Sequence, residues 1–377
     1  MRRIVVVGGS IAALTAAESL RAEGFDGSLA ILSEEAHRPY SRVPLSKGLR
    51  AGDPLRDAVL LPAPGAGIDF RAGSRAARLD ATRRVVTLAD GEEVPYDGLV
   101  VATGARARRL GGGQELVVRT LDDVEALAAR VAGARSVAVV GGGFLGMELA
   151  STCRALGLDV TVVDREPPLA RLLGDWLAGF VVAAARDQGV TFRHAPDGVA
   201  LAGPHAVRLG RETVQADVIV SAVGDLPNTE WLAGSGLPLD GGLTADDRCR
   251  VAPGIVAAGD VVARRGPDGR ARRTPHWTNA VEQGRAAAAG LLRGDEARPY
   301  QADRYFWTEQ FGLDIKISGR LPLAGAPEVL RGSVEERSAL LRWRHADGAT
   351  AVTVNHRMPV PRLRSLGAQA PAEGLGN

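Results

Sequence analysis

The sequence predicts an α/β fold with two parallel sheets of the same design, followed by a smaller α+β domain. One observation is a unit of apolar strand, glycine turn and helix that occurs twice, at residues 4–24 and 136–157. Each unit then continues into a second apolar strand, at 28–32 and 159–163. From about residue 300 the composition changes to alternating apolar and polar residues. Continuous apolar strands that alternate with helices are typical of parallel sheets buried on both faces.

The elements follow in chain order. The first unit runs through a strand at 4–7, a turn at 8–13 and a helix that Gly24 ends. Further strands are expected at 97–101, 216–221 and 254–258, and the segments 305–307 and 349–354 are expected to be antiparallel strands. The last residues, 367–377, are rich in Gly, Ala and Pro and are expected to fray. The predicted domains are residues 1–108 with 240–299, residues 109–239, and residues 300–377.

Composition excludes several classes of protein. The 377 residues are enough for two or three domains, and 46 basic against 44 acidic residues argue against a dedicated nucleic-acid binder. Cys153 and Cys249 lack the spacing of a redox dithiol or a zinc site, which favours a reducing, cytoplasmic setting without a metal. The opening apolar run is broken by glycines and indicates a strand and turn rather than a signal peptide, and no run is long enough for a membrane span.

The glycine turns indicate nucleotide binding, because backbone amides at a helix start bind phosphate and a Cβ would block its approach. The second turn is complete, and Asp164 follows Gly146 by 18 residues, where its carboxylate can bind ribose hydroxyls. A carboxylate there repels a 2′-phosphate, so Asp164 favours NADH over NADPH, and the adjacent Arg165 weakens that preference.

The first turn departs from the pattern, since Ser10 replaces the second glycine and Ala13 the third. Serine is small and can itself donate to a phosphate, so a nucleotide is still expected here. Glu34 or Glu35, after the next strand, would bind its ribose. Two nicotinamide sites in one chain would serve little purpose, and the simplest interpretation is two Rossmann-like domains with FAD in the first and NADH in the second.

The run EEAHRPYSRVPLSK, residues 34–47, resembles the signature of the FAD-dependent ferredoxin reductases that serve Rieske dioxygenases and haem-thiolate monooxygenases. These proteins share the pyridine nucleotide-disulfide oxidoreductase fold. Further segments follow in that family's order, at 102–106, at Glu148 after the second glycine turn, at 259–260, at 277–283 and at 306–310. The resemblance covers about residues 3 to 366.

The resemblance implies a residue set for each cofactor. The FAD set is Gly8, Ser10, Ile11, Ala12, Ala13, Glu34, Glu35, Arg42, Lys47, Ala76, Ala102, Thr103, Gly104, Arg108, Gly259, Asp260 and Trp277. The NADH set is Gly141, Gly143, Phe144, Leu145, Gly146, Asp164, Arg165 and Gly224. Asp260 would reach the ribityl chain or pyrophosphate, the backbone of Ala76 would lie near the adenine, and Trp277 would lie beside the isoalloxazine unless it is a core aromatic.

The resemblance also implies that Lys47, Glu148 and Trp277 are catalytic. Lys47 and Lys316 are the only lysines beside 44 arginines, a bias that base composition explains. A fixed cation near a reduced flavin would favour reduction, because the flavin's N1–C2=O edge then carries negative charge. We therefore predict a Lys47–Glu148 pair that orders the nicotinamide pocket, the alternative being a surface lysine that only closes a turn.

The predicted function is transfer of hydride from NADH to FAD and of single electrons to a two-iron two-sulfur ferredoxin, which supplies a cytochrome P-450 type monooxygenase or a Rieske dioxygenase. An arginine-rich segment before Trp277 is either a docking surface for an acidic ferredoxin or a solvated hairpin tip. Its arginines are Arg264, Arg265, Arg270, Arg272 and Arg273. The oligomeric state, monomer or homodimer, is left open.

Four departures from the family pattern put the electron acceptor in doubt. Ser41 stands where Asp is usual, Val43 where the proline is doubled, and Pro275 where Glu is common, and the chain ends before the usual tail. Two alternatives therefore stay open. One is a flavoenzyme of this fold that acts directly on a small organic substrate in a biosynthetic pathway. The other is an NADH-responsive binding protein that resembles apoptosis-inducing factor. Disulfide reductases of related fold need a cysteine near the flavin, which neither cysteine here provides.

Overall fold

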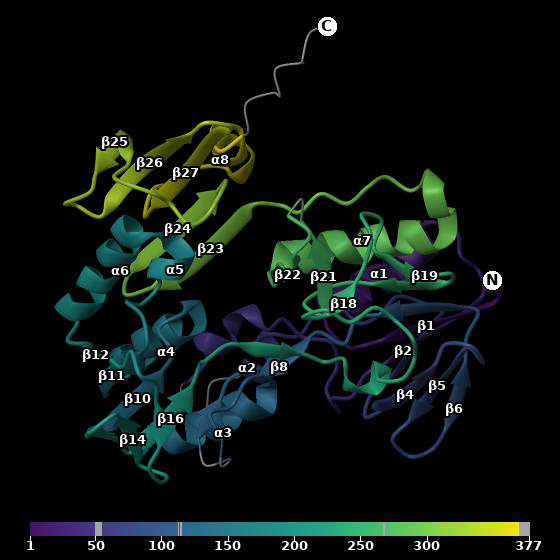
Figure 1. Cartoon of the computed structure of the whole chain (residues 1–377), viewed down its shortest axis with the longest axis horizontal. Coiled ribbons are helices and arrows are strands. Elements are labelled where there is room, and N and C mark those ends of the chain that lie inside the picture. Colours follow the sequence, from purple (N-terminus) through teal and green to yellow (C-terminus); the bar gives the residue numbers. More distant parts are fainter. Residues whose placement is uncertain (50–54, 112, 114, 267, 369–377) are drawn as a thin grey trace, which may run out of the picture. The chain divides into compact units, whose positions relative to one another are not determined.

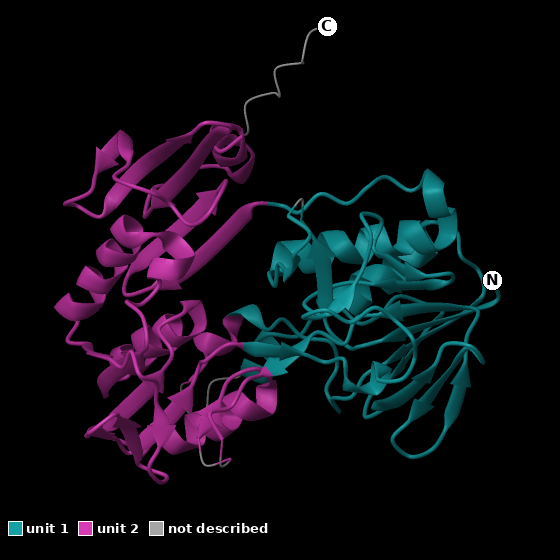
Figure 2. Ribbon diagram, in the orientation of Figure 1, with its two compact units in different colours: residues 1–43, 55–106, 225–303 teal, residues 44–54, 107–224, 304–377 magenta. Residues whose placement is uncertain are grey.

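The computed structural model describes residues 1–49, 55–111, 113, 115–266 and 268–368. The chain forms two compact units, each assembled from separate stretches of sequence (Figure 2). Unit 1 comprises Met1–Val43, Leu55–Arg106 and Asp225–Asp303, and unit 2 comprises Pro44–Pro54, Ala107–Gly224 and Arg304–Asn377. No helix in the described part of the chain is long and apolar enough to cross a membrane.

Unit 1 is built on a six-stranded sheet in the order β19-β20-β7-β1-β2-β3, parallel except for β19 at its edge. Figure 1 labels β1, β2 and β19 of this sheet. Its strands are β1 (Arg3–Val7), β2 (Ser28–Leu32), β3 (Ile68–Arg71), β7 (Gly98–Val101), β19 (Arg250–Ala252) and β20 (Ile255–Ala257). Ile4 and Val6 belong to one core cluster and Val5 and Val7 to another. Both faces of the sheet are therefore buried, as the apolar runs predict.

Different elements cover the two faces. Helices α1 (Ile11–Ala22) and α7 (Trp277–Arg293) contribute alanines to one cluster, and Gly284 lets them approach, since a Cβ there would lie 2.8 Å from the Ala12 carbonyl oxygen. The other cluster takes residues from the antiparallel strands β4 (Ala76–Asp80), β5 (Val85–Leu88) and β6 (Glu93–Pro95).

Shorter elements complete unit 1 or mark its boundaries. They are η1 (Val43–Ser46), α2 (Leu55–Ala58), β8 (Ala105–Ala107), β17 (Asp225–Pro227), η2 (Glu230–Leu232), β18 (Leu243–Thr244), β21 (Val262–Arg265), β22 (Ala271–Arg273) and η3 (Gly294–Glu296). Strands β21 and β22 pair antiparallel, so the arginine-rich segment forms a hairpin.

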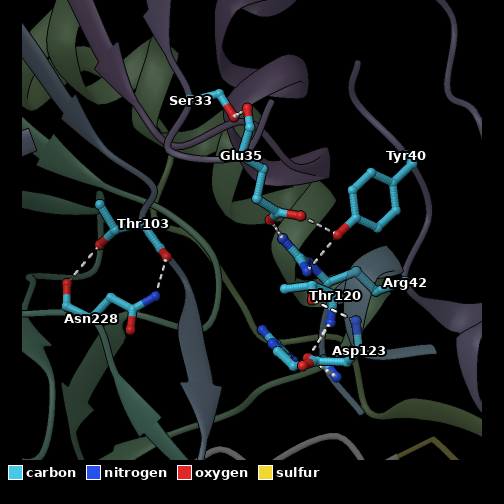
Figure 3. A network of polar contacts seen from close by, with 9 residues as sticks. Ser33, Glu35, Tyr40, Arg42, Thr103, Thr120, Asp123 and Asn228 are labelled. Atoms are coloured by element: carbon cyan, nitrogen blue, oxygen red, sulfur yellow. Dashed lines mark hydrogen bonds and ion pairs between the residues drawn. The ribbon is translucent and has the colours of Figure 1, made fainter. Parts of the chain in front are cut away.

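Unit 2 contains a second parallel sheet, in the order β12-β11-β10-β16-β9. Its strands are β9 (Leu116–Val117), β10 (Ser136–Val140), β11 (Asp159–Asp164), β12 (Thr191–His194) and β16 (Val218–Ser221). Its helices are α3 (Leu121–Val131), α4 (Phe144–Ala155), α5 (Ala170–Leu173) and α6 (Asp175–Asp187), and β13 (Ala200–Leu201), β14 (Ala206–Leu209) and β15 (Glu212–Gln215) form an antiparallel sheet. Thr120 and Asp123 form a capping box that starts α3, because each side chain bonds the other's backbone N–H (Figure 3).

The last part of unit 2 is a five-stranded antiparallel sheet in the order β23-β24-β27-β26-β25. It contains β23 (Tyr305–Gln310), β24 (Leu313–Ser318), β25 (Glu328–Ser333), β26 (Ser338–His345), β27 (Gly348–Val354) and the helix α8 (Val360–Leu366). The antiparallel strands predicted at 305–307 and 349–354 are confirmed. Most of the segment predicted to fray, 369–377, lies outside the described residues.

The predicted three-domain partition stays a prediction. The residues from Asp225 to 239, which that partition gives to the second domain, lie in unit 1 together with the first parallel sheet. Trp231 and Leu232 show why, since both are buried in a core cluster of unit 1.

Candidate functional site

The first glycine turn is set by a steric constraint at the carboxyl end of β1. Gly8 has φ +128, and a Cβ on it would lie 2.1 Å from the carbonyl oxygen of Ala102, which follows the adjacent strand β7. Helix α1 starts directly after Ser10, whose side chain makes no capping hydrogen bond with the described residues. The first amides of α1 are thus left without a side-chain partner and can bind a phosphate.

The second turn repeats this design at the end of β10. Gly141 has φ +109, and a Cβ on it would lie 2.3 Å from the Ala222 carbonyl oxygen. A Cβ on Gly146 would lie 1.9 Å from the carbonyl oxygen of Gly141. Helix α4 starts after Gly143, which has no side chain to cap it. A dinucleotide's pyrophosphate fits this turn for the same reason as the first.

Predicted ligand residues gather at the carboxyl edge of each sheet. In unit 1, Gly8, Ala102 and Gly259 follow the adjacent strands β1, β7 and β20. In unit 2, Gly141 and Asp164 lie at the ends of the adjacent strands β10 and β11. Ligands of open parallel sheets bind at this edge, so each unit offers one candidate nucleotide site.

Asp164 contacts the second glycine turn directly. Its Oδ2 accepts a hydrogen bond of 2.5 Å from Gly142 N–H, and its Oδ1 accepts one of 2.5 Å from Arg165 N–H. Gly224 follows the neighbouring strand β16 and accepts a 2.9 Å hydrogen bond from Arg108 N–H, while the Arg108 side chain is exposed. The bonds from Gly142 and Arg165 hold the Asp164 carboxylate beside the turn, where a ribose would lie.

Glu34 and Glu35, the two candidates for binding ribose in unit 1, have different surroundings. Glu34 is exposed and pairs with Arg75. Glu35 accepts hydrogen bonds from the Tyr40 hydroxyl and from Arg42, and Arg42 also donates to Tyr40 Oη at 3.0 Å (Figure 3). Burial acts to lower the pKa of Arg42, but the Glu35 and Tyr40 charges outweigh it and raise that pKa. The Arg42 guanidinium is therefore a fixed cation in unit 1.

The loop after β7 is fixed by a residue that sequence reasoning missed. Thr103 Oγ1 donates to the Asn228 carbonyl at 2.8 Å, and Asn228 Nδ2 donates to the Thr103 carbonyl at 2.9 Å (Figure 3). The paired bonds hold two loops that are 125 positions apart in the chain. The only signal in the sequence is that Asn228 comes four residues after Gly224, the glycine that follows the apolar strand predicted at 216–221.

Asp260 is held by its backbone. Arg273 donates to the Asp260 carbonyl at 3.0 Å and to both Asp225 carboxylate oxygens, at 2.6 and 3.0 Å. Gln283 Oε1 accepts from the preceding Gly259 N–H at 2.8 Å. The Arg273 side chain is only 15% exposed, so it supports the Asp260 loop rather than presenting its charge to solvent.

Of the predicted flavin residues, Lys47 and Arg108 lie in unit 2, and the others lie in unit 1. Ala12 and Ala13 are buried in the core, so only their backbone can face a ligand, and Ala76 begins β4. Trp277 begins α7 and is partly exposed, which argues against a purely core role. Burial lowers the pKa of the preceding His276 to about 4, so this imidazole is neutral at neutral pH.

The predicted Lys47–Glu148 pair is present in unit 2. Lys47 Nζ donates to Glu148 Oε2 at 3.0 Å, and the side chains are 34% and 14% exposed. Ser46 Oγ donates to the same oxygen at 2.6 Å, and Thr308 Oγ1 donates to Oε1 at 2.7 Å. Lys316, by contrast, pairs with Asp314 on the sheet containing β23. Thr308 lies in the segment 306–310 that follows the family's order, but nothing in the sequence directs its hydroxyl to Glu148, which is 160 positions away.

Residues 2–284 match the family model described as pyridine nucleotide-disulphide oxidoreductase. The chain belongs to this family. It is 38% identical over 349 residues to the anthranilate 1,2-dioxygenase system ferredoxin–NAD(+) reductase component of Burkholderia cepacia, which covers 87% of this chain and 84% of that protein. It is 35% identical to rhodocoxin reductase of Rhodococcus erythropolis, with 88% and 81% covered.

A solved structure of putidaredoxin reductase, in covalent complex with putidaredoxin, matches with a TM-score of 0.84 and 28% identity, over 94% of this chain and 90% of that one. The predicted fold class, family and enzyme class are thereby confirmed. The chain is an oxidoreductase, and its family and homologous ferredoxin reductases use FAD and NAD(H). Among the described residues, no cluster of three or more His, Cys, Asp or Glu side chains could hold a metal ion.

We predict that Asp225→Asn weakens FAD retention, because Arg273 then loses a partly buried charged partner and holds the Asp260 carbonyl less firmly. A loss of about 1.4 kcal/mol would raise the FAD dissociation constant about tenfold. Flavin fluorescence on dilution measures this. Asp240→Asn, which breaks the exposed pair with Arg265, is the control. Equal FAD retention in the two variants would contradict the prediction.

We also predict that His276 makes the protein less stable in acid. The unfolded chain binds a proton at this residue below its ordinary pKa of 6.5, whereas the folded chain does so only near 4. The free energy of unfolding therefore falls as pH drops from 6.5 to 4, by roughly 3 kcal/mol from this residue. His276→Gln should reduce the change of the urea unfolding midpoint with pH over that range. His205→Gln, at an exposed histidine, should not. Parallel pH curves for wild type and H276Q would refute the assignment.

Proposed function

We propose that this protein oxidises NADH with a bound FAD and passes single electrons to a ferredoxin that feeds a Rieske dioxygenase or a haem-thiolate monooxygenase. The relatives named as ferredoxin reductases support this function across most of the chain. The observation that carries it is that each of the two parallel sheets has a glycine turn suited to a dinucleotide at its carboxyl edge, and that neither cysteine of the chain is a reactive thiol. Burial raises the pKa of both Cys153 and Cys249 to about 12, so neither thiol is suited to disulfide chemistry.

Bound FAD supplies the ability to accept two electrons as hydride and to release them one at a time. The chain's contribution is to bind and orient. In unit 1 the α1 amides would hold the pyrophosphate, with Arg42 and Asp260 nearby in the FAD set. In unit 2 the α4 amides and Asp164 would hold NADH, and the Asp164 carboxylate would disfavour a 2′-phosphate.

We propose that the Lys47–Glu148 pair orders the nicotinamide pocket. The lysine ammonium is a compact charge on a flexible stem, unlike a planar guanidinium. Glu148 limits that flexibility by pairing with the ammonium at 3.0 Å. A positive charge held in place stabilises negative charge that develops during reduction.

The arginine-rich hairpin supplies a smaller docking surface than the sequence indicates. Arg273 pairs with Asp225, and the Arg264 guanidinium lies over the Tyr300 ring. The exposed arginines are Arg265, Arg270 and Arg272, two of which pair with exposed aspartates of this chain. We propose that these three steer a two-iron two-sulfur ferredoxin whose acidic side chains compete for them. A cytoplasmic setting is consistent with the two unpaired cysteines.

Stopped-flow kinetics with NADH and a two-iron two-sulfur ferredoxin test the function. We expect NADH to reduce the flavin and the ferredoxin to reoxidise it over many turnovers. A long-lived reduced flavin–NAD complex with poor turnover would instead favour the NADH-responsive binding protein. Reduction that no ferredoxin reoxidises, but that a small organic substrate does, would favour the direct flavoenzyme.

Arg270→Glu combined with Arg272→Glu should lower the rate of ferredoxin reduction at least tenfold at low salt, since steering by charge changes association rates by 10 to 1,000-fold. The rate with ferricyanide, which needs no protein docking, should stay within about twofold. Arg320→Glu, two residues after the end of β24 and also an exposed arginine paired with an aspartate, is the control. An equal fall with ferredoxin in both proteins would remove the hairpin from docking.

Asp164→Asn should shift nucleotide preference towards NADPH, because the neutral amide no longer repels a 2′-phosphate and Arg165 lies next to it. A change of about 1.4 kcal/mol predicts a roughly tenfold higher ratio of NADPH to NADH kcat/KM. Steady-state kinetics with both nucleotides measure it. Asp159→Asn, at the exposed start of the same strand, should leave the ratio unchanged. An unchanged ratio in Asp164→Asn would place the ribose elsewhere.

A further inference from the structure

Alternate side chains of strand β23 contact side chains on one face of helix α4. Phe306, Thr308 and Gln310 alternate along β23 and share a face, while Phe144 and Glu148 lie one turn apart on α4. The rings of Phe144 and Phe306 have centroids 4.2 Å apart, and Thr308 Oγ1 lies 2.7 Å from Glu148 Oε1. The strand therefore reaches the helix at the residue that pairs with Lys47.

The Glu148 carboxylate is held from both sides. Oε2 accepts from Ser46 Oγ at 2.6 Å and from Lys47 Nζ at 3.0 Å, whereas Oε1 accepts from Thr308 Oγ1. Ser46 and Thr308 are 3% and 1% exposed, so water does not compete for either hydroxyl. Each carboxylate oxygen thus has one buried hydroxyl directed at it.

The directions of these hydrogen bonds follow from their partners. Gln310 Nε2 donates to Thr308 Oγ1 at 3.0 Å, and the ionised carboxylate can only accept, so the threonine proton points to Glu148. Lys47 Nζ lies 3.4 Å from Ser46 Oγ and donates to it in the same way, leaving the serine proton for Oε2. Both hydroxyls are therefore donors to the carboxylate.

The backbone of the lysine loop is fixed to the same helix. Thr152, one turn after Glu148, places its Oγ1 2.8 Å from the Ser46 carbonyl oxygen. The Lys47 N–H donates to Pro44 O at 2.9 Å and closes the η1 turn. With the loop backbone fixed, the remaining freedom of the ion pair lies in the Glu148 carboxylate and the Lys47 stem.

We propose that the Thr308 and Ser46 hydroxyls are positioning groups for the Lys47–Glu148 pair, one on each carboxylate oxygen. They orient the carboxylate so that Oε2 faces the ammonium, and Gln310 orients the Thr308 hydroxyl. Without either hydroxyl the carboxylate can rotate and the lysine samples more positions. This inference rests on the role proposed for the pair in ordering the nicotinamide pocket.

Chemical labelling tests the geometry without any cofactor. The chain has only two lysines, and Lys47 and Lys316 are both in ion pairs and 34% and 31% exposed, so Lys316 is an internal standard. In protein stripped of FAD, amine acetylation followed by mass spectrometry should show Lys47 labelling at least threefold faster, relative to Lys316, in Thr308→Val and in Ser46→Ala, as expected for loss of one ordinary contact. Thr308→Ser should restore the wild-type ratio.

Thr350→Val is the matched control, because Thr350 is equally buried in the same antiparallel sheet and its hydroxyl bonds Arg320 and His345, outside this network and away from Lys316. Its Lys47 to Lys316 ratio should equal that of the wild type. An unchanged ratio in Thr308→Val or in Ser46→Ala would overturn the proposal for that hydroxyl. The same increase in T350V would also overturn it, because loss of any buried hydroxyl in the sheet would then suffice. If T308V does not fold, Thr308→Ala, which also lacks the hydroxyl, takes its place and should show the same increase.

Hydride transfer separates this inference from the proposed function. At saturating NADH, single-turnover flavin reduction should slow about tenfold in Lys47→Met and about threefold in Thr308→Val, with the NADH dissociation constant changed less than about twofold in T308V. T308V should slow K47M no further, since it acts through that lysine. Two results would reject the positioning role of Thr308 and leave the proposed role of the pair intact. In one, K47M reduces the flavin slowly but T308V does so at the wild-type rate. In the other, T308V slows K47M further. A normal rate in K47M would reject the proposed role of the pair.

Discussion

The fold and both nucleotide sites depend on one steric constraint, the tight turn from a parallel strand into a helix. A Cβ at Gly8 or at Gly141 would lie only 2.1 or 2.3 Å from a carbonyl oxygen in the loop that follows the adjacent strand of the sheet. Positive φ at both positions makes any other residue strained even if space were made. Because the turn is this tight, each helix starts at the sheet edge with its amides facing outward.

Carboxylates that are held by arginine, lysine and hydroxyl groups then fix the loops around these turns. Glu35 fixes Arg42, Asp225 fixes Arg273, and Glu148 fixes Lys47. Asp225 and Arg273, and Glu148 and Lys47, come from distant segments of the chain, so each of these two ion pairs restrains one segment against another. Glu35 and Arg42 lie seven positions apart, so their pair restrains a single loop. Partial burial makes such restraints stronger than exposed pairs, which contribute little.

Many of the arginines in this chain do not present a free charge to solvent. Many arginines pair with neighbouring acids on the surface, as Arg83 does with Glu93 and Arg342 with Glu328. Five arginines close together in sequence are therefore not five free charges, because the β21–β22 hairpin uses Arg273 internally and stacks Arg264 on Tyr300. Charge counted along the sequence overestimates the charge presented to a partner.

The sequence by itself determined the repeated strand-turn-helix units, both parallel sheets, the dinucleotide turns and the candidate pair of Lys47 and Glu148. These features depend on residues close together in the chain, or on a family pattern that spans it, and local sterics decide the turns. The contacts of Thr308, Asn228 and Asp225 could not be predicted, since their partners lie 160, 125 and 48 positions away and no family pattern pairs them. Only the tertiary structure decides which loops meet at a sheet edge and which face of β23 packs on α4, because side-chain packing and strand order select those contacts.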